Sequence, residues 1–366
     1  MSDFSFSGGS AGDFHADASE SGVDRESVYS GLTEAPSIYS FNSSRDGLAL
    51  LRLIQGRTFN AQNDLYYLPA DGTEFARQEK THFAQLVCLG RLYVEHEQVQ
   101  RILSPVDNAQ KRILDLGTGV GNWAVGMAHE FPHAEVIGID LAPNTASSGV
   151  LPPNCRLEFD DFNLGLHHYY NSCDIIHCRI IAIGVKDFKW FITEVAKCLK
   201  PGGMLLMVEG DHNLLNSKKE MQELAYGSGA PGQSWLARAM FEASITMQKR
   251  GSDVDARLRL YELISASPYF ENVGERIHFI PVGPWEKGST PDEQQQKQIL
   301  GILERQSMID LVQSLKPLFI HEGYATELVE QFIKGTEKEL NELTVQMYIK
   351  WLYFFGTRNS AGIMET

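Results

Sequence analysis

One stretch constrains the fold of this chain more than any other: Ile113-Leu114-Asp115-Leu116-Gly117-Thr118-Gly119-Val120-Gly121-Asn122-Trp123. It joins an apolar segment over 112–116, which we predict as a strand, to a segment over 122–131 with helical spacing of its apolar residues. Glycines let the backbone turn tightly and approach a ligand closely, and the start of a helix offers free N–H groups. The pattern therefore predicts a parallel α/β sheet with a small-molecule site at this turn.

Strands and helices alternate after this turn. Apolar segments over 135–140, 155–159, 173–178 and 204–209 are predicted as further strands, and 187–199 carries an apolar helical stripe. Two later β-prone segments, 276–282 and 348–355, predict an antiparallel pair at the edge of the sheet. Together these segments predict an α/β fold with a Rossmann-like, seven-stranded, mostly parallel sheet and helices on both faces.

Three helical regions lie outside this pattern. Residues 76–103, 233–250 and 296–344 have apolar residues at helical spacing, and we expect them to cap the carboxyl edge of the sheet. The expected organisation is a tail over 1–45, an N-terminal helical region over 46–110, the core over 111–215, and cap insertions with the last strands over 216–366.

Residues 1–45 differ from the rest of the chain in composition. They are rich in Ser, Gly and acidic residues, with seven carboxylates against Arg25 and Arg45. Such a segment, without periodic apolar residues, cannot offset its ordering entropy by burial, so we predict a disordered acidic tail. Tyr29, Tyr39 and Phe41 leave a second interpretation open, an arm that orders on a partner or folds over the site.

The charge and composition of the chain limit its partners. The net charge is −15 without a basic cluster, so a phosphate backbone would be repelled and we expect no nucleic-acid substrate. The sequence shows neither a secretory leader nor an apolar run of about 18 residues, the length of a membrane span. The five cysteines are odd in number and lack C-x-x-C spacing, which predicts reduced thiols. We therefore expect a cytoplasmic protein without a membrane partner, or a nuclear one if it acts as a regulator.

The glycine pattern separates two types of cofactor. A dinucleotide fingerprint needs Gly or Ala at position 122, where this chain has Asn122, and the third glycine comes one residue earlier, at Gly121. The carboxylate of Asp115 would repel a pyrophosphate but attract the ammonium and sulfonium groups of S-adenosylmethionine. The pattern D-x-G-x-G-x-G over 115–121 therefore favours S-adenosylmethionine.

Acidic residues also follow the next two predicted strands. Asp140, with Leu141 behind it, lies 23 residues after Gly117, where a carboxylate can accept both hydroxyls of a ribose. The third strand runs into Asp161 and Phe162, an acid for the adenine amino group and a ring that covers the base. Because the carboxyl ends of parallel strands meet at one edge, these acids predict a single cofactor site.

Six stretches carry a likeness to a known family: LPADGTEFARQEKTHF (68–83), RILDLGTGVGNWAVGMAHEFPHAEVIGIDLAP (112–143), LPPNCRLEFDDFN (151–163), CDIIHCRII (173–181), LKPGGMLLMVEGD (199–211) and IPVGPW (280–285). Over about residues 50–357 the chain resembles the class I methyltransferases, and within them the fungal secondary-metabolism group related to the velvet-complex regulator. The resemblance implies S-adenosylmethionine as cofactor and S-adenosylhomocysteine as product. It further implies that the methionine part contacts Gly117, Thr118, Gly119 and Gly121. By the same resemblance, the ribose contacts Asp140, and the adenine contacts Asp161 and Phe162.

One element departs from the pattern of that family. Relatives often have N-G-R-x-Y-H ahead of the Leu-Pro pair, whereas this chain has Gln55-Gly56-Arg57-Thr58-Phe59-Asn60. A role that the Tyr and His have in relatives therefore does not carry over directly to Phe59 and Asn60. Arg57 and the nearby Tyr66 remain, and we expect them, together with His82 and Trp235, on the acceptor side of the site.

Methyl transfer to a hydroxyl needs a group that accepts its proton. His212 follows the fifth strand and is the expected base, although a histidine in a solvent-exposed loop would have the same pattern. His177 lies within a strand and is predicted to be packed or hydrogen bonded. Arg179 is expected either to bind the carboxylate of the cofactor or to form a structural ion pair. No residue spacing indicates a metal site, and His167 and His168 are predicted in a surface loop.

Two functions are compatible with these expectations. The first is an enzyme that methylates a small organic acceptor, aromatic or another secondary metabolite, at oxygen, with transfer to nitrogen or carbon left open. Aromatic residues in the predicted cap suit an apolar acceptor. The second is a regulator of secondary metabolism that binds S-adenosylmethionine and acts through partner proteins. A homodimer is compatible with both.

Overall fold

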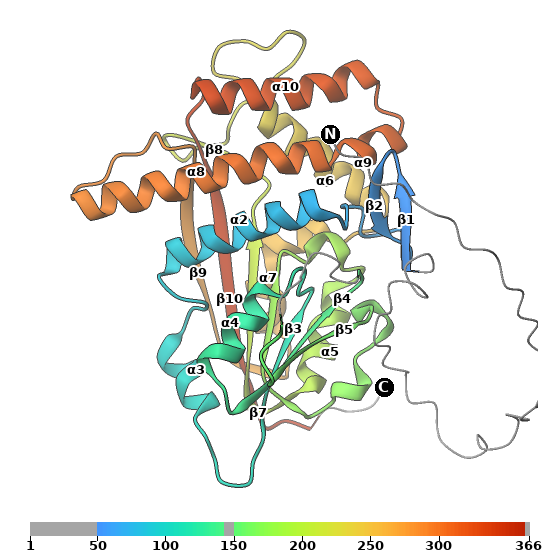
Figure 1. Ribbon diagram of the computed structural model, residues 1–366, viewed down its shortest axis with the longest axis vertical. Coiled ribbons are helices and arrows are strands. Elements are labelled where there is room, and N and C mark those ends of the chain that lie inside the picture. The colour runs from blue at the N-terminus through green and yellow to red at the C-terminus, as the bar shows by residue number, and fades with distance from the viewer. Residues whose placement is uncertain (1–49, 143–149, 363–366) are drawn as a thin grey trace, which may run out of the picture. The chain divides into compact units, whose positions relative to one another are not determined.

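A mostly parallel sheet organises the part of the chain that the computed structural model describes, residues 50–142 and 150–362. Its strands follow one another in the order β5 (Cys155–Phe159), β4 (Ala134–Asp140), β3 (Lys111–Leu116), β6 (Cys173–Arg179), β7 (Leu199–Gly210), β10 (Met347–Arg358) and β9 (Phe270–Val282). The first five strands are parallel, and β10 is antiparallel to both β7 and β9 (Figure 1). A two-residue strand, β8 (Leu215–Asn216), pairs with the start of β10.

The described residues also form α-helices. They are α2 (Gly72–Leu89), α3 (His96–Leu103), α4 (Asn122–Glu130), α5 (Phe188–Cys198), α6 (Trp235–Lys249), α7 (Leu260–Ala266), α8 (Pro291–Ser314), α9 (Lys316–His321) and α10 (Thr326–Glu342). Short 3-10 turns are η1 (Phe162–Leu164), η2 (His167–Tyr169), η3 (Ala182–Gly184) and η4 (Val254–Arg259).

All seven predicted strands are confirmed, including the antiparallel pair at the edge, while β8 was not expected. Strand β7 begins at Leu199, five residues before the prediction, because the Pro-Gly-Gly segment after it does not end the strand. The pairing of β6 with β7 instead shifts register between Cys173 and Ile175. Gly202 absorbs the irregularity with a φ of 83°.

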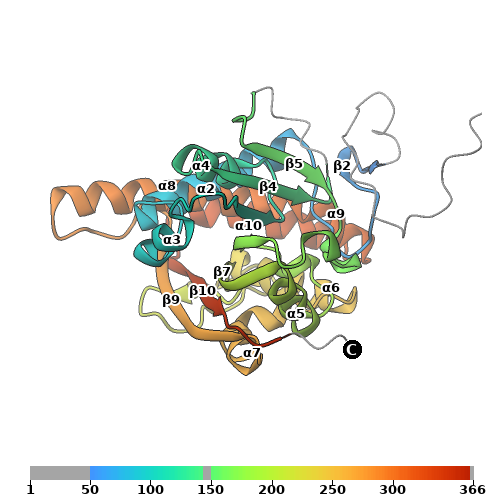
Figure 2. The same ribbon diagram turned by 90° about the horizontal axis from the view of Figure 1, so that it is seen from below.

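Side chains of the central strands alternate between two buried faces. Ile113 and Ile175 pack into a cluster with residues of α3 and α4, whereas Leu114 and Ile176 pack into the larger cluster with residues of α5 and α7. Figure 2 shows α3 and α4 on one side of the sheet and α5 and α7 on the other. Burial on both faces explains why β3 and β6 each carry two consecutive apolar residues at these positions.

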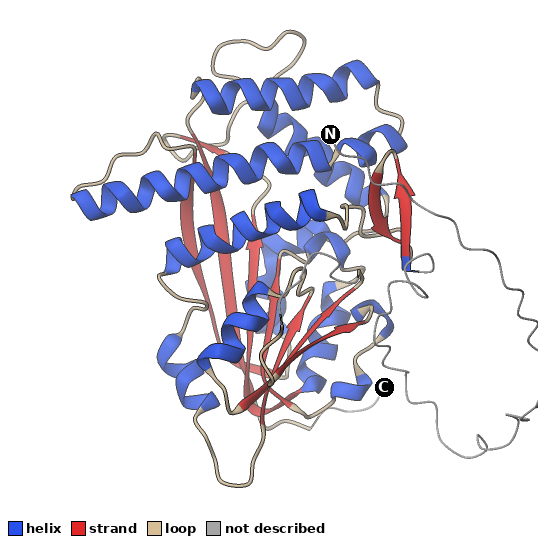
Figure 3. Ribbon diagram, viewed as in Figure 1, coloured by secondary structure: helices blue, strands red, loops and turns tan. Residues whose placement is uncertain are grey.

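A helical cap lies over the carboxyl ends of the parallel strands. Helices α2, α8 and α10 cross this edge in successive rows, with α2 packed along α8 and α10 against α6 and α8 (Figures 1 and 3). Asp71 caps the start of α2, where its side chain accepts the N–H of Glu74 at 3.2 Å. The cap therefore places α2 directly above the strand ends at which the sequence predicts the cofactor.

Two helical regions that we predicted as continuous are interrupted. The region 76–103 is two helices, because Gly90 adopts a left-handed φ of 67° and donates its N–H to Leu86, which ends α2. The region 296–344 is three helices. Pro317, the second residue of α9, has no N–H with which to continue the hydrogen bonding of α8, and Gly323 has a φ of 83° in the turn before α10.

A β-hairpin that the sequence analysis missed precedes the cap. Strands β1 (Leu51–Ile54) and β2 (Arg57–Asn60) pair antiparallel through the two-residue turn Gln55-Gly56. Both turn residues have positive φ, 49° and 78°, as a tight hairpin turn requires. The element that departs from the family pattern is therefore the second strand of this hairpin with its turn.

Some expectations fall outside what the structure describes. The predicted acidic tail over 1–45, with Tyr29, Tyr39 and Phe41, lies outside the described residues. Residues 50–142 and 150–362 belong to one compact unit. All five cysteines are free, and all but Cys88 are buried. None of the helices in the described chain combines the length and apolar content needed to cross a membrane.

Candidate functional site

The glycine-rich turn between β3 and α4 forms the floor of a cavity. Gly117, Gly119 and Gly121 have φ values of 71°, 56° and 82°, and α4 begins immediately after them. A Cβ atom at Gly117 would lie 2.6 Å from the side chain of Ile181, so the backbone there approaches its neighbours too closely for any side chain. Two backbone hydrogen bonds hold the turn against β4, because the N–H groups of Gly117 and Thr118 both donate to the carbonyl of Ile139 at 2.9 Å.

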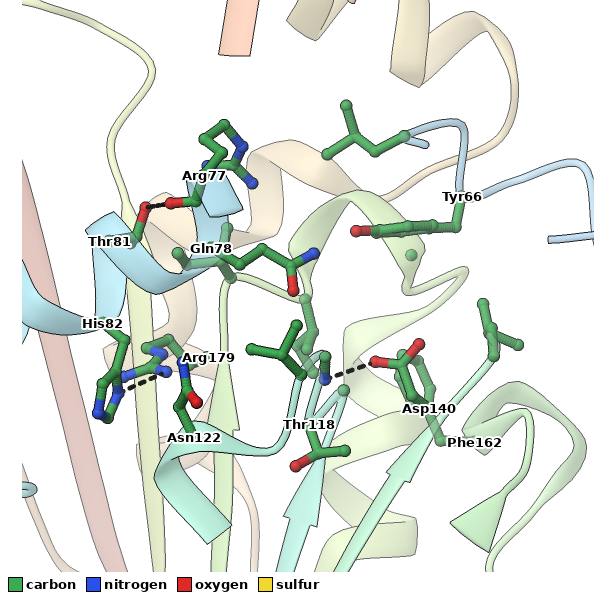
Figure 4. Close-up of a pocket in the computed structure, with 18 residues that line it drawn as sticks. Tyr66, Arg77, Gln78, Thr81, His82, Thr118, Asn122, Asp140, Phe162 and Arg179 are labelled. Atoms are coloured by element: carbon green, nitrogen blue, oxygen red, sulfur yellow. Dashed lines mark hydrogen bonds between the residues drawn. The ribbon is translucent and has the colours of Figure 1, made fainter. Parts of the chain in front are cut away.

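Asp140 lies at the end of β4, next to this turn. One carboxylate oxygen accepts the N–H of Gly119 at 2.8 Å, and the other accepts the N–H of Ala142 at 3.1 Å. Burial raises the pKa of Asp140, although these two backbone bonds act in the opposite direction. Asp140 and Leu141 both line the cavity, and Figure 4 shows the bond from the turn to the carboxylate.

Asp115 stands behind the turn rather than in the cavity. It is 2% exposed and accepts hydrogen bonds from the hydroxyl of Thr118 and from Nδ1 of His177, both at 2.7 Å. The His177 ring stacks on Trp123 at a centroid distance of 3.8 Å, which agrees with its prediction as a packed histidine. Asp115 therefore supports the turn and is not one of the residues that line the cavity.

Arg179, at the end of β6, brings a positive charge to the opposite wall. Its guanidinium Nη2 donates to Nδ1 of His82 at 3.2 Å, and within the described chain it forms no ion pair. Burial and Arg179 together lower the pKa of His82 to about 4, so this histidine is neutral near pH 7. Figure 4 shows Arg179 and His82 across the cavity from Asp140. The arrangement leaves a cation free to meet an anionic group.

Phe162 and Tyr66 line the far end of the cavity. Tyr66 lies over Gly184, where a Cβ atom would come within 3.3 Å of its ring. Asp161, just before Phe162, is 8% exposed and lies outside the lining. It accepts Nδ2 of Asn63 and the N–H of Asn163, both at 2.9 Å, so it fixes this end of the cavity.

The two residues that depart from the family pattern shape the loop that carries Tyr66. The amide oxygen of Asn60 accepts the N–H groups of Gln62 and Asn63, and its Nδ2 donates to the carbonyl of Tyr66 at 2.9 Å. Phe59 is completely buried. Neither Phe59 nor Asn60 lines the cavity, so their roles here are structural.

Helix α2 supplies lining residues that the sequence analysis missed: Arg77, Gln78 and Thr81. Arg77 is 6% exposed, and its guanidinium binds the carboxylate of Glu74 at 3.0 and 2.5 Å. Thr81 bonds to Ser307 on α8 at 2.9 Å. The signal that could have found them is a row of polar residues at spacings of three and four along one face of α2.

The cavity as a whole is partly open to solvent. Its lining consists of Tyr66, Leu68, Arg77, Gln78, Thr81, His82, Gly117, Thr118, Gly119, Val120, Asn122, Asp140, Leu141, Phe162, Arg179, Ile180, Ile181 and Gly184. Of the predicted cofactor residues, Asp115, Gly121 and Asp161 lie behind this lining and support it.

A second, smaller cavity adjoins the first beneath the cap. The two share Leu68, Arg77, Thr81 and Ile180, so these residues stand at the junction. We call the second cavity the cap chamber; its remaining lining is Ile183, Gly210, His212, Met240, Ala243, Met247, Met308, Leu311, Leu315, Ile349 and Trp351. The chamber is thus closed by α6, α8 and β10, which are distant from one another in the sequence.

His212 lies in the cap chamber and not in an open loop. Its Nδ1 is 2.8 Å from the hydroxyl of Ser244 on α6. Burial, together with the positive charge of Arg257, holds the pKa of His212 well below its usual range. The imidazole is therefore neutral near pH 7, and the ring nitrogen that does not face Ser244 remains for another partner.

Two of the residues expected on the acceptor side lie elsewhere. Arg57 forms an ion pair with Asp71 at 2.6 Å, next to the start of α2, and lines neither cavity. Trp235 packs against Phe332 of α10 and also lies outside both linings. Tyr66 and His82 do line the first cavity.

The loop with His167 and His168 is the 3-10 turn η2, where His168 Nε2 lies 3.1 Å from Asp160. A search of residues 50–142 and 150–362 finds no group of three or more His, Cys, Asp or Glu side chains arranged to hold a metal ion.

Comparisons with known proteins agree with the geometry. A family model described as a methyltransferase domain matches residues 89–250. The chain is 36% identical over 232 residues to the secondary metabolism regulator laeA of Coprinopsis cinerea, an alignment that covers 63% of this chain and 56% of the relative. It is 28% identical to methyltransferase pytC of Aspergillus terreus, with 75% of this chain and 77% of the relative covered. Methyltransferase str2 of Strobilurus tenacellus is 26% identical, with 82% and 98% covered.

Among solved structures, phosphoethanolamine N-methyltransferase 2 of Haemonchus contortus superposes with a TM-score of 0.42 and 16% identity, covering 83% of this chain and 62% of that one. The chain spans just over half the length of the laeA regulator.

Proposed function

Because this chain belongs to the class I S-adenosylmethionine-dependent methyltransferases, we propose that it transfers a methyl group to a small organic acceptor of fungal secondary metabolism, at an oxygen atom. The observation that carries this proposal is the junction of two cavities at Arg77, Thr81 and Ile180. The first cavity has the charges and the open backbone that suit the cofactor. The cap chamber has the apolar lining that suits an organic acceptor.

The residues of the first cavity fit S-adenosylmethionine. We assign the backbone of Gly117 and Gly119 to the methionine part, because both glycines line the cavity and have no side chain of their own to separate the backbone from a ligand. Arg179 would bind its carboxylate, Asp140 the ribose hydroxyls, and Phe162 would cover the adenine. When bound, the cofactor supplies an electrophilic methyl group for an in-line displacement.

The chain itself positions the acceptor and receives its proton. In our proposal, the free nitrogen of His212 accepts the hydroxyl proton while Ser244 holds the other nitrogen at 2.8 Å. A neutral imidazole is needed for this step, and burial of His212 provides it. The cap excludes water from the chamber, which favours transfer to the acceptor over loss of the methyl group to water.

Calorimetric titration with S-adenosylhomocysteine, with NAD as the control, tests the cofactor assignment. We expect micromolar binding of the first and none of the second, followed by transfer of a labelled methyl group to members of a panel of phenols. Absence of S-adenosylhomocysteine binding would contradict the cofactor site. Binding without turnover of any phenol would contradict the acceptor class.

A second candidate function rests on the 36% identity to the laeA regulator. In that case the chain binds the cofactor and acts on secondary metabolism through partner proteins, in the cytoplasm or the nucleus. Purification from its source under native conditions separates the two functions. A stoichiometric protein partner, together with no turnover, would favour the regulator, and sedimentation of the pure chain would show whether it forms a homodimer.

A further inference from the structure

The lining of the cap chamber indicates whether its ligand is charged. The inference drawn from it rests on the proposed function, in which the chamber holds the methyl acceptor. Its lining is apolar except for Arg77, Thr81, His212 and the indole N–H of Trp351. The hydroxyl of Thr81 is already bonded to Ser307 at 2.9 Å. Whether the chamber takes a charged or an uncharged acceptor therefore depends on Arg77 and His212.

The charge of Arg77 is balanced within the chain. Glu74, which is completely buried, binds the guanidinium through both carboxylate oxygens, with nitrogen–oxygen distances of 3.0 and 2.5 Å. Ser314 donates its hydroxyl to the same carboxylate at 2.9 Å and holds the pair in place. A second acid, Glu304, is also completely buried; burial raises its pKa to about 7, and the positive charge of Arg77 acts in the opposite direction. The guanidinium is thus already paired with the carboxylate of Glu74, and an anionic ligand would have to compete with this buried ion pair.

His212 adds no charge either. Burial and Arg257 keep its imidazole neutral near pH 7, and Ser244 occupies Nδ1. The other ring nitrogen can form one hydrogen bond to a ligand hydroxyl. The indole N–H of Trp351 is uncharged as well, so His212 and Trp351 offer a ligand only neutral polar contacts.

The remaining lining adapts in shape. Met240 and Met247 on α6 face the chamber together with Met308 on α8. Methionine side chains are unbranched and rotate about three bonds, so they fit irregular apolar surfaces. The lining is thus suited to ligands of several outlines but not to a buried charge.

We propose that the cap chamber binds an uncharged, largely apolar acceptor that carries a hydroxyl group, and that it rejects carboxylate and phosphate analogues of the same size. A carboxylate would lose its hydration and meet an ion pair that is already complete. The charge of the ligand, rather than its shape, is the property for which this lining selects.

A matched series of probes tests the proposal on the full chain saturated with S-adenosylhomocysteine. The probes are 2-naphthol, methyl 6-hydroxy-2-naphthoate and 6-hydroxy-2-naphthoate, which share one ring system and differ in charge. Calorimetry should show binding of the two neutral probes and binding of the carboxylate that is at least about 10-fold weaker. Equal or tighter binding of the carboxylate would overturn the proposal, as would no binding of any probe.

Substitutions test whether the probes bind in the cap chamber. Met308→Trp fills the space and should abolish naphthol binding, whereas Ile302→Trp, at a position 46% exposed on the same helix, should leave it unchanged. Met240→Phe on α6 is a second filling variant if Met308→Trp does not fold. S-adenosylhomocysteine affinity should stay unchanged in all three. Unchanged naphthol binding in both filling variants would overturn the assignment of the binding site to the cap chamber. If the unmodified chain does not bind S-adenosylhomocysteine, the proposed function itself is overturned.

Discussion

The carboxylate of Glu209 accepts the backbone N–H of Ile181 at 2.9 Å and, with the same oxygen, that of Ala182 at 3.0 Å. Glu209 is 2% exposed at the end of β7. The turn that it holds contains Ile180, whose φ of 57° lies in the left-handed region, an uncommon and strained conformation for a β-branched residue. Ile180 lines both cavities and Ile181 contacts the glycine turn, so this carboxylate holds the wall between the two binding spaces.

Glu209→Ala should weaken binding of S-adenosylhomocysteine by about 1–3 kcal/mol, because two buried N–H groups lose their acceptor and the strained turn is released. Glu209→Gln keeps a side-chain oxygen for the two N–H groups and should restore most of the affinity. Calorimetry gives the affinities, and thermal melts show that the variants are folded. Equal affinities for the Ala variant and the unmodified chain would show that the turn does not depend on Glu209.

Asp140→Ala should weaken S-adenosylhomocysteine binding by about 1–3 kcal/mol through the loss of charge-assisted hydrogen bonds to the ribose hydroxyls. Asp107→Ala is the matched control, because Asp107 is an exposed carboxylate in the loop before β3. Titration calorimetry on both variants measures the difference. An unchanged affinity in a folded Asp140 variant would rule out our position for the ribose.

Gly117→Ala should destabilise the protein for two reasons, and Gly202→Ala is a control to which only one of them applies. At Gly117 the left-handed φ is accompanied by a contact of 2.6 Å between the new Cβ atom and Ile181, whereas at Gly202 the φ of 83° has open space around it. Each Ala variant should lose about 1 kcal/mol of unfolding free energy to the backbone conformation. Gly117→Ala should lose more, and it alone should weaken S-adenosylhomocysteine binding. Urea unfolding and calorimetry test this, and equal losses in both assays would count against the close approach at Gly117.

His82 should make the protein less stable in mild acid. Its pKa is lowered to about 4 in the folded chain, against about 6.5 in an unfolded one. Between these values the unfolded state binds more protons, so the free energy of unfolding falls as the pH falls, by roughly 2 kcal/mol at pH 5 from this residue. His82→Gln keeps an acceptor for Arg179 without the titration and should show a shallower loss.

Chemical unfolding of His82→Gln from pH 7 to pH 4.5 measures that slope. His129→Gln, at an exposed position on α4, serves as the control and should follow the unmodified chain. A slope for His82→Gln equal to that of the unmodified chain would mean that His82 does not carry the acid sensitivity.

The core of the fold could be predicted from local patterns in the sequence. Buried parallel strands are apolar along their length, and the glycine turn before Asn122 has few alternative conformations, so the strands around β3 could be located. The acids at the strand ends were found by the same logic, and Asp140 indeed lies beside the turn. Asp115 and Asp161 show what sequence spacing cannot predict. The spacing does not tell whether a carboxylate faces a cavity or lies behind its lining.

The cap could be predicted only in part. Gly90 ends α2 although the apolar spacing continues past it, because a left-handed residue stops a helix even when the next residues favour one. The cap chamber depends on contacts between segments as distant as Leu68 and Trp351, and no local pattern encodes such contacts. The expectation that aromatic cap residues line the acceptor site therefore gave Trp235, which packs against Phe332 of the cap.

The chain positions of the lining residues also set an order of assembly during synthesis. Every residue that lines the first cavity lies between Tyr66 and Gly184, whereas the cap chamber also needs Ile349 and Trp351 of β10. Ribosomes make proteins from the N-terminus, so all parts of the first cavity leave the ribosome well before the last wall of the chamber. The cap chamber is closed only when β10 packs near residues from the first part of the described chain, such as Leu68, and a ribosome that stalls before β10 yields a chain that has its glycine turn but an incomplete cap chamber.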